Sequence, residues 1–256
     1  IFNTSLIPSI QDGPTCYTYN SNSYNNSLAE LFNNKGYQTN GFHSNYKEFY
    51  TRDIVYNGFL YDNFYGQHEL YLDEIEKKFD STFFEKSIDF SIHKDVPFFS
   101  MLLTLSGHSP YDSSNLAAET HYSEVDSYYG DSVPESIKYY IASQMETEVM
   151  VGELFIYLEN EGLLDNTVIV LTNDHYPYAL NQSDYKTYKG IEEDFEKNEG
   201  LMYIWGNEIQ HKEVSKLTSS FDFLPTMLNM FGLAGNYSNY VGNDIFSEEY
   251  DPIVYF

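Results

Sequence analysis

The chain has 256 residues, a formal net charge of −26 and an isoelectric point near 4.3. Such an acidic protein has no general basic surface for nucleic acid, and it repels polyanions at long range, so phosphate chemistry here requires a local positive site. No apolar run is long enough to cross a bilayer, and the single cysteine, Cys16, excludes an intrachain disulfide. At this length we expect one domain over residues 1–256.

The first half of the chain alternates between helical and extended patterns. Its predicted elements are a helix over 24–36, a strand over 37–42, loops with short helices over 46–66, a helix over 72–90, a buried strand over 97–105 and a loop over 109–133. Gly36 supplies the stop signal of the first helix. The last segment is rich in Ser, Asp and Tyr and has no periodicity, which is typical of a loop on the active-site side or of a surface excursion.

The second half begins with a long helix that opens at Pro134 and ends at Gly162. After it we expect a strand over 167–171, a loop with a helical turn over 183–199, a strand over 201–205, a helix over 220–231 and a final strand over 253–256. Glu148 interrupts the apolar stripe of the long helix, and we expect it at the helix edge rather than as a ligand. Strands alternating with helices predict an α/β fold with a mostly parallel central sheet and helices on both faces.

Polar residues of catalytic type follow three of the predicted strands. The run Thr167 to Leu171 leads into Asp174-His175, which predicts a buried parallel strand that carries a carboxylate and an imidazole at its tip. His43 and His108 follow two other strands. Because the carboxyl ends of parallel strands share one edge of a sheet, we expect these residues on that edge. Carboxylate and imidazole together suit a divalent metal.

Arg52 is the candidate anion ligand, because its planar guanidinium matches phosphate or sulfate oxygens. The alternative is a loop ion pair between Arg52 and Asp53, and both readings stay open here. Four further histidines lie in polar stretches and are expected in solvent: His68, His93, His121 and His211.

Five segments, taken together and in order, resemble the lipoteichoic acid synthase family, which are sulfatase-like phosphoglycerol transferases of the alkaline phosphatase superfamily. The segments are NTSLIPSIQDG, GYQTNGFHSNYKEFYTRD, TLSGHSP, NEGLLDNTVIVLTNDHY, and FDFLPTMLNMFGL with VGNDIFS. The resemblance covers nearly the whole chain. It implies the superfamily's α/β fold with a mostly parallel sheet.

The resemblance also implies site residues by motif position. Asp174 and His175 would be metal ligands, for manganese first, with magnesium or zinc as alternatives. His43, Tyr50, Arg52 and His108 would bind the substrate, and His108 would also transfer a proton. Tyr50 stands where the family has Trp, and Gly107 where it has Asn. We expect the nucleophilic Thr and a ligand Glu to lie upstream of Ile1, in a longer protein.

The implied reaction moves glycerophosphate from a phosphatidylglycerol-type lipid head group, through the upstream Thr, to the hydroxyl of a glycerophosphate polymer or a glycolipid. The implied location is the outer face of the cell membrane of a Gram-positive-type bacterium, with anchoring helices ahead of this chain. No nucleic-acid partner is expected. Two alternatives remain: a sulfatase or a transferase of another phospho-head group, and a non-catalytic module that binds a wall polymer.

Overall fold

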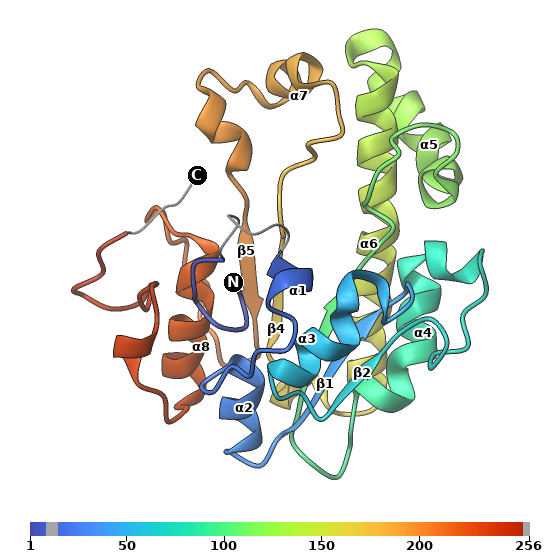
Figure 1. Cartoon of the computed structure of the whole chain (residues 1–256). Helices are drawn as coiled ribbons and strands as arrows, with labels where there is room; N and C mark the ends of the chain where they lie inside the picture. Colours follow the sequence, from blue (N-terminus) through green and yellow to red (C-terminus); the bar gives the residue numbers. More distant parts are fainter. Residues whose placement is uncertain (9–14, 253–256) are drawn as a thin grey trace. The chain divides into compact units, whose positions relative to one another are not determined.

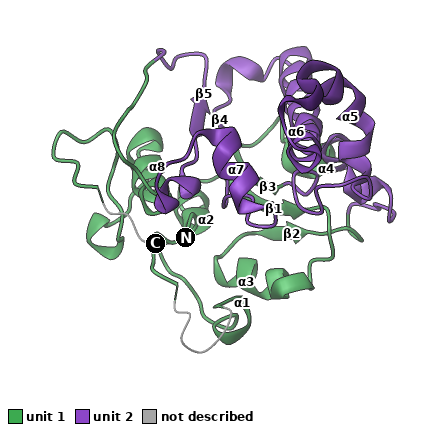
Figure 2. Ribbon diagram, turned by 90° about the horizontal axis from the view of Figure 1, so that it is seen from above, with its two compact units in different colours: residues 1–69, 87–103, 212–256 green, residues 70–86, 104–211 purple. Residues whose placement is uncertain are grey.

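The computed structural model describes residues 1–8 and 15–252 (Figure 1). The chain forms two compact units, shown in separate colours in Figure 2. Unit 1 consists of residues 1–69, 87–103 and 212–256, and unit 2 consists of residues 70–86 and 104–211. The strand expected over 253–256 lies outside the described residues. Whether residues 1–256 act as one catalytic domain stays a prediction.

Unit 1 is built around a three-stranded parallel sheet. Its strands are β1 (Gln38–His43), β2 (Asn63–Tyr65) and β3 (Phe98–Leu103), in the order β2-β1-β3. The register pairs His43 of β1 with Leu103 of β3, so the carboxyl ends of these two strands lie side by side. The predictions for β1 and β3 are confirmed. The three-residue strand β2 was not predicted, because it lies within a turn-rich segment.

The centre of this sheet is buried under aromatic side chains. A side-chain carbon on Gly41 of β1 would come within 2.7 Å of the Tyr56 ring and 2.8 Å of the Phe64 ring, so only glycine admits both rings. Tyr56 packs with Ala29 and Tyr61 in a buried cluster. Ala29 belongs to α2 (Leu28–Asn33), which Ser27 caps by accepting a hydrogen bond from the amide of Glu30. This helix is shorter than the predicted 24–36.

The remaining helices of unit 1 are short. They are α1 (Thr15–Thr18), η1 (Phe49–Thr51), α3 (Arg52–Gly58), η6 (Ser220–Asp222), α8 (Phe223–Phe231) and η7 (Tyr237–Asn239). The helix predicted over 220–231 is confirmed as η6 followed by α8. It ends at Gly232, whose φ of 56° is the left-handed conformation that favours glycine at a helix end.

Unit 2 contains most of the longer helices. Its elements are η2 (Glu76–Lys78), α5 (Leu116–Tyr129), η3 (Gly130–Ser132), α6 (Glu135–Asn160), η4 (Leu164–Asn166), β4 (Ile169–Thr172), α7 (Gln182–Lys189), η5 (Asp194–Asn198) and β5 (Met202–Trp205). Helix α4 (Asp80–Ser91) begins in unit 2 and ends in unit 1. The helix predicted over 72–90 is confirmed in part, since α4 begins only at Asp80 and η2 precedes it. The helix predicted from Pro134 is confirmed, with Pro134 immediately before the first residue of α6.

The loop predicted over 109–133 is wrong, because most of that segment is helix α5. Asn115 caps α5 by accepting a hydrogen bond from the amide of Ala118. Ala118 and Val125 pack against Tyr139 and Ala142 of α6 in a buried cluster, and Figure 1 shows the two helices side by side. Together with two partly buried tyrosines of α5, Ala118 and Val125 recur at steps of four and three, a helical period that the many polar residues between them mask in the sequence.

The strand before Asp174-His175 exists, but the parallel pairing expected for it is wrong. Strand β4 pairs antiparallel with β5, with Ile169 opposite Trp205. A short apolar run carries no information on the direction of its partner, which explains the error. The α/β fold class is confirmed by the parallel sheet of unit 1 and the surrounding helices. In the described ranges, no helix has both the length and the apolar content required to cross a membrane.

Candidate functional site

His43 occupies the carboxyl end of β1 and is buried. Its Nδ1 lies 2.9 Å from the carbonyl oxygen of Leu103, the last residue of β3. A carbonyl can only accept, so Nδ1 carries the proton and donates it. The parallel register of β1 and β3 therefore sets both the position and the tautomer of this ring.

A strained turn at Tyr50 and Thr51 lies between β1 and α3, directly before Arg52. Tyr50 and Arg52 are the other two residues of unit 1 that are predicted to bind substrate. Tyr50 and Thr51 both have left-handed backbones, with φ of 59° and 50°. Two consecutive residues other than glycine rarely adopt this conformation, and a β-branched Thr does so at a real cost. The Thr51 hydroxyl donates to the carbonyl of Cys16 at 2.6 Å, and the Tyr50 ring lies 5.9 Å from the Tyr17 ring. These contacts with α1 hold the turn.

Arg52 begins α3 directly after this turn, and two aromatic rings hold its guanidinium. The Arg52 Cζ lies 5.3 Å from the centre of the Tyr50 ring and 5.6 Å from that of Phe49. Its Nη1 also donates to the Phe49 carbonyl at 3.0 Å. Among the described residues no carboxylate forms a salt bridge with Arg52, so the alternative ion pair with Asp53 is not found. The cation therefore keeps donors for an anion from outside.

Partial burial lowers the pKa of Arg52, and the neighbouring Tyr56 and Tyr50 oppose this effect. The guanidinium is protonated at all physiological pH values in any case. Because an anionic ligand would relieve the cost of burying this unpaired charge, the geometry favours a phosphate or sulfate oxygen beside Arg52.

Asp174 and His175 lie just past the end of β4 in unit 2, and both are exposed. The His175 Nδ1 lies 2.8 Å from the carbonyl of Tyr176, to which it donates, and its Nε2 lies 3.4 Å from the Asp174 Oδ2. Donation of one ring N–H to a carbonyl is the usual arrangement of a metal-binding histidine. Two donors on a tetrahedral ion at about 2.0–2.2 Å are themselves about 3.4 Å apart. The pair therefore fits one side of a divalent-metal site.

No third donor joins this pair in the part of the chain that the structure describes. Groups of three or more His, Cys, Asp or Glu side chains with metal-binding geometry do not occur within residues 1–8 and 15–252. The sequence predicted the same two ligands in this chain, with the others upstream. The assignment of Asp174 and His175 to a metal stays a prediction.

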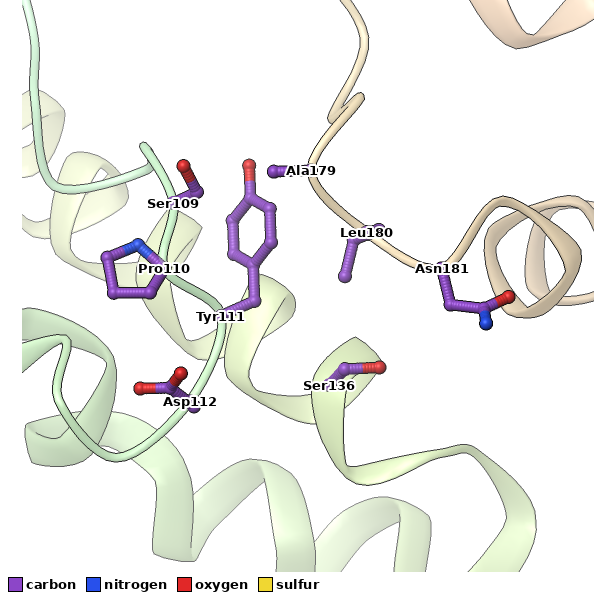
Figure 3. A pocket seen from close by; sticks show the side chains of 8 residues that line it. All are labelled: Ser109, Pro110, Tyr111, Asp112, Ser136, Ala179, Leu180 and Asn181. Atoms are coloured by element: carbon purple, nitrogen blue, oxygen red, sulfur yellow. The ribbon is translucent and has the colours of Figure 1, made fainter.

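His108 follows β3 along the chain but belongs to unit 2, where it is exposed. Its Nδ1 lies 2.9 Å from the carbonyl of Ser109, so this nitrogen carries the proton and donates it. Tyr111, three residues on, lines a cavity of about 480 Å³ in the same unit (Figure 3). Burial raises the pKa of Tyr111 to about 12, and the nearby Tyr140, Tyr178 and Asp174 add to the rise. The cavity therefore lies within electrostatic reach of the predicted metal ligands.

A buried acidic network in unit 2 was not predicted from the sequence. Glu146 of α6 is buried; it accepts a hydrogen bond from the Ser81 hydroxyl at 2.5 Å and lies 2.9 Å from the Nε2 of His121. The expectation that His121 lies in solvent is wrong, because His121 is half-buried and pairs with Glu146. Glu148 is exposed at the helix edge, as predicted. The residues around Glu146 in the sequence gave no sign of a buried carboxylate.

The other solvent assignments have mixed outcomes. His68 and His211 are exposed, as expected. His93 is half-buried, and its Nε2 lies 3.3 Å from the side-chain amide of Asn40 in β1, so the expectation for this residue is wrong. Within the described ranges, neither His93 nor His121 forms a hydrogen bond or ring contact with a residue predicted to bind substrate or metal.

A family model for sulfatases matches residues 6–233 of the chain. The chain belongs to the sulfatase family. The lipoteichoic acid synthase of Staphylococcus saprophyticus is 29% identical over 245 residues, which cover 92% of this chain and 37% of that protein. This sulfatase-family chain therefore spans little more than one third of the length of that curated relative. The predicted resemblance to lipoteichoic acid synthases is confirmed.

Solved structures show the same fold. The lipoteichoic acid synthase LtaP from Listeria monocytogenes matches with a TM-score of 0.77 and 22% identity, over 95% of this chain and 61% of that chain. A protein in the alkaline phosphatase superfamily from Vibrio parahaemolyticus has a TM-score of 0.64 and 18% identity, over 96% and 56%. The Streptococcus pyogenes phosphoglycerol transferase GacH, in complex with sn-glycerol-1-phosphate, has a TM-score of 0.56 and 16% identity, over 89% and 59%. At these identities the matches establish the fold alone.

Proposed function

We propose that the chain is part of a divalent-metal-dependent phosphoglycerol transferase, which moves glycerophosphate from a phosphatidylglycerol-type head group to an acceptor hydroxyl. The observation that carries the proposal is the Arg52 guanidinium, which two aromatic rings hold on a strained turn and which has no carboxylate partner among the described residues. The similarity to a lipoteichoic acid synthase and to a phosphoglycerol transferase solved with sn-glycerol-1-phosphate supports this substrate class.

Each candidate residue has a role that its chemistry permits. The Arg52 fork binds two phosphoryl oxygens, and the exposed Tyr50 ring offers an apolar face to the glycerol carbons. His43 would contribute its imidazole at the carboxyl end of β1 to hydrogen bonding with the glycerol. His108 gives a proton to the departing lipid oxygen and takes one from the incoming acceptor hydroxyl, since an imidazole nitrogen can both donate and accept a proton.

Asp174 and His175 would hold one side of the metal, and manganese is the first candidate, with magnesium or zinc as alternatives. A bound divalent ion supplies charge neutralisation at the phosphoryl oxygens and a lowered pKa for the attacking hydroxyl. Enzymes of the sulfatase and alkaline phosphatase groups generally depend on divalent metals, which supports this assignment. The remaining ligands and the Thr nucleophile would come from sequence ahead of Ile1, in a protein anchored at the outer face of a Gram-positive-type cell membrane.

The test is glycerophosphate transfer by the protein encoded by the complete gene, with phosphatidylglycerol as donor. Arg52→Ala is expected to lower turnover by at least 100-fold, because charge stabilisation by a positioned donor contributes about that much. Arg52→Lys should recover only part of the loss, since lysine keeps the charge but not the fork. The matched control is Lys47→Ala, which removes an equal charge from the same segment where Lys47 pairs with Glu69 at 2.5 Å.

Near-normal transfer by Arg52→Ala would contradict the proposal. A sulfatase is the second candidate, because the matching family model is that of sulfatases and a guanidinium binds sulfate as well as phosphate. Hydrolysis of an aryl sulfate by the complete protein, without glycerophosphate transfer, would favour that function. If the complete protein binds wall polymer but turns over neither substrate, it is a binding module.

A further inference from the structure

The imidazole of His108 is exposed, and a carbonyl of its own loop orients it. Its Nδ1 donates to the carbonyl oxygen of Ser109 at 2.9 Å. Because Nδ1 carries the proton of the neutral ring, Nε2 is the nitrogen that can take up a second one. The direction of Nε2 therefore depends on where the Ser109 carbonyl lies, and so on the backbone of the loop.

The side chain of Asn115, from outside this loop, holds the loop backbone at three points. The Asn115 Nδ2 donates to the carbonyl oxygens of Ser106, His108 and Pro110, at 3.2, 3.1 and 3.3 Å. An amide nitrogen carries two N–H groups, so at least one of them is shared between two carbonyls. The three carbonyls alternate along the chain. The loop therefore curves around the Asn115 amide, and Ser109 lies between two residues that this amide binds.

Asn115 is fixed in turn by the helix that follows it. It is the N-cap residue of α5, and its Oδ1 accepts a hydrogen bond from the amide of Ala118 at 3.1 Å. Ala118 is fully buried in the cluster between α5 and α6. The oxygen of the side chain thus serves the helix, whereas its nitrogen serves the loop. One residue ties the His108 loop to a packed element of unit 2.

Two other side chains hold only the start of the loop. Asp80 is fully buried and accepts hydrogen bonds from the amides of residues 105 and 106, at 2.8 and 3.1 Å. The Gln144 Nε2 donates to the carbonyl of Gly107 at 3.1 Å. Among the described residues, neither of these side chains bonds to the loop beyond Gly107. The part that orients the imidazole therefore depends on Asn115.

We propose that Asn115 is a positioning residue, which acts through the loop backbone and the Ser109 carbonyl to direct the His108 Nε2. The catalytic part of this inference rests on the proposed function, whereas the ordering of the loop does not. In the imidazolium form, Nε2 gives its proton to the departing lipid oxygen as the bond from phosphorus to that oxygen breaks. The neutral ring then takes the proton of the acceptor hydroxyl at Nε2. A displacement of about 1 Å can slow such a step about 100-fold, so a residue that touches no substrate can limit turnover.

Asn115→Asp separates the two roles of this side chain. Aspartate caps helices as well as asparagine does, so α5 keeps its cap, but a carboxylate has no N–H group for the three carbonyls. Hydrogen exchange of the complete protein, followed by mass spectrometry, should be about tenfold faster over residues 104–110 and unchanged over residues 116–129. The kcat of glycerophosphate transfer should fall by about tenfold or more. KM should change little, because Tyr50 and Arg52 keep their contacts.

The matched control is Asn181→Asp, which makes the same change of charge at the N-cap of α7. The Asn181 Oδ1 accepts hydrogen bonds from the amides of Ser183 and Asp184. Its Nδ2 donates to no carbonyl among the described residues, so exchange over residues 104–110 and kcat should both stay at the parent values.

Equal exchange over residues 104–110 in Asn115→Asp and the parent would overturn the inference, because Asn115 would then not hold the loop. Faster exchange there with an unchanged kcat would also overturn it. A fall in kcat that appears equally in Asn181→Asp, or together with faster exchange over residues 116–129, would assign the effect to charge or to the helix instead. If the complete parent protein transfers no glycerophosphate, the proposed function fails, and the exchange rates alone decide whether Asn115 orders the loop.

Discussion

Replacing Thr51 by valine tests whether one hydroxyl holds the left-handed turn that precedes Arg52. Valine has nearly the same shape as threonine and keeps the branch at Cβ, so the cost of a φ of 50° remains. The substitution removes the hydrogen bond from the hydroxyl to the Cys16 carbonyl at 2.6 Å. Thr51→Ser keeps the hydroxyl and is the matched control.

The expected changes in the free energy of unfolding follow from the lost hydrogen bond and from the backbone strain. A hydrogen bond of this kind contributes a net ~1 kcal/mol to stability, so Thr51→Val should lower the free energy of unfolding by that amount. Thr51→Ser should stay within about 0.5 kcal/mol of the parent. Thr51→Gly also loses the hydroxyl, but it relieves backbone strain of ~1–2 kcal/mol, offset in part by unfolded-chain entropy of ~0.5–1 kcal/mol. Glycine should therefore be more stable than valine here, which reverses the usual order in a helical segment.

Urea unfolding of the four proteins measures this order directly. Binding of sn-glycerol 1-phosphate to the complete protein gives a second readout, in which ~1 kcal/mol allows at most about fivefold weaker binding for Thr51→Val. The reasoning is refuted if valine and serine have the same unfolding free energy, because the hydroxyl would then not hold the turn. It is also refuted if glycine is the least stable of the four, because the turn would then store no strain.

Three further predictions concern other parts of the molecule. Glu146→Ala should lower the free energy of unfolding by ~2–3 kcal/mol, because it leaves the hydrogen-bond donors of Ser81 and His121 unpaired. Glu148→Ala, on the exposed side of the same helix, should change the free energy of unfolding by less than about 0.5 kcal/mol. Urea unfolding of the two variants compares these values. Burial raises the pKa of Tyr56 to about 12, with the Arg52 charge opposing the rise. A group whose pKa is raised in the folded state gives stability that is complete below pH 10 and is lost as the pH rises through 12. Tyr56→Phe should therefore reduce the loss of unfolding free energy between pH 10 and 12. An equal loss in both proteins would argue against this contribution of Tyr56. Asp174→Ala in the complete protein should abolish Mn²⁺ binding measured by electron paramagnetic resonance, and unchanged binding would remove Asp174 from the metal site.

The sequence predicted best those elements whose signal is local. Strands β1 and β3 follow from their apolar runs and stops, and α6 and α8 follow from a proline start or a glycine end. The family resemblance rested on segments that contain or follow these elements, and the match of the sulfatase family model over residues 6–233 supports it. Local patterns were sufficient there because the residues that define each element also mark its end.

Features that depend on a distant partner were not predictable in this way. The direction of β4 depends on β5, which lies some thirty residues further on and pairs antiparallel with it. Helix α5 is stabilised by packing against α6, and the polar residues of α5 mask the helical spacing of the residues that make this contact. The burial of Glu146 depends on His121 and Ser81, neither of which has a distinctive sequence context. In each case the deciding contact joins segments far apart in the chain.

The turn at Tyr50 and Thr51 depends on both a local sequence motif and contacts with a distant segment. The motif placed an aromatic residue and an arginine two positions apart, but nothing in it indicated a left-handed backbone, since neither Tyr nor Thr favours one. Strain of this kind persists only where surrounding contacts impose it, and here they come from Cys16 and Tyr17 of α1. A turn held from outside fixes the direction of the Arg52 guanidinium more tightly than an unstrained loop would. We therefore expect substitutions at Tyr17 to weaken anion binding at Arg52 although Tyr17 carries no charge.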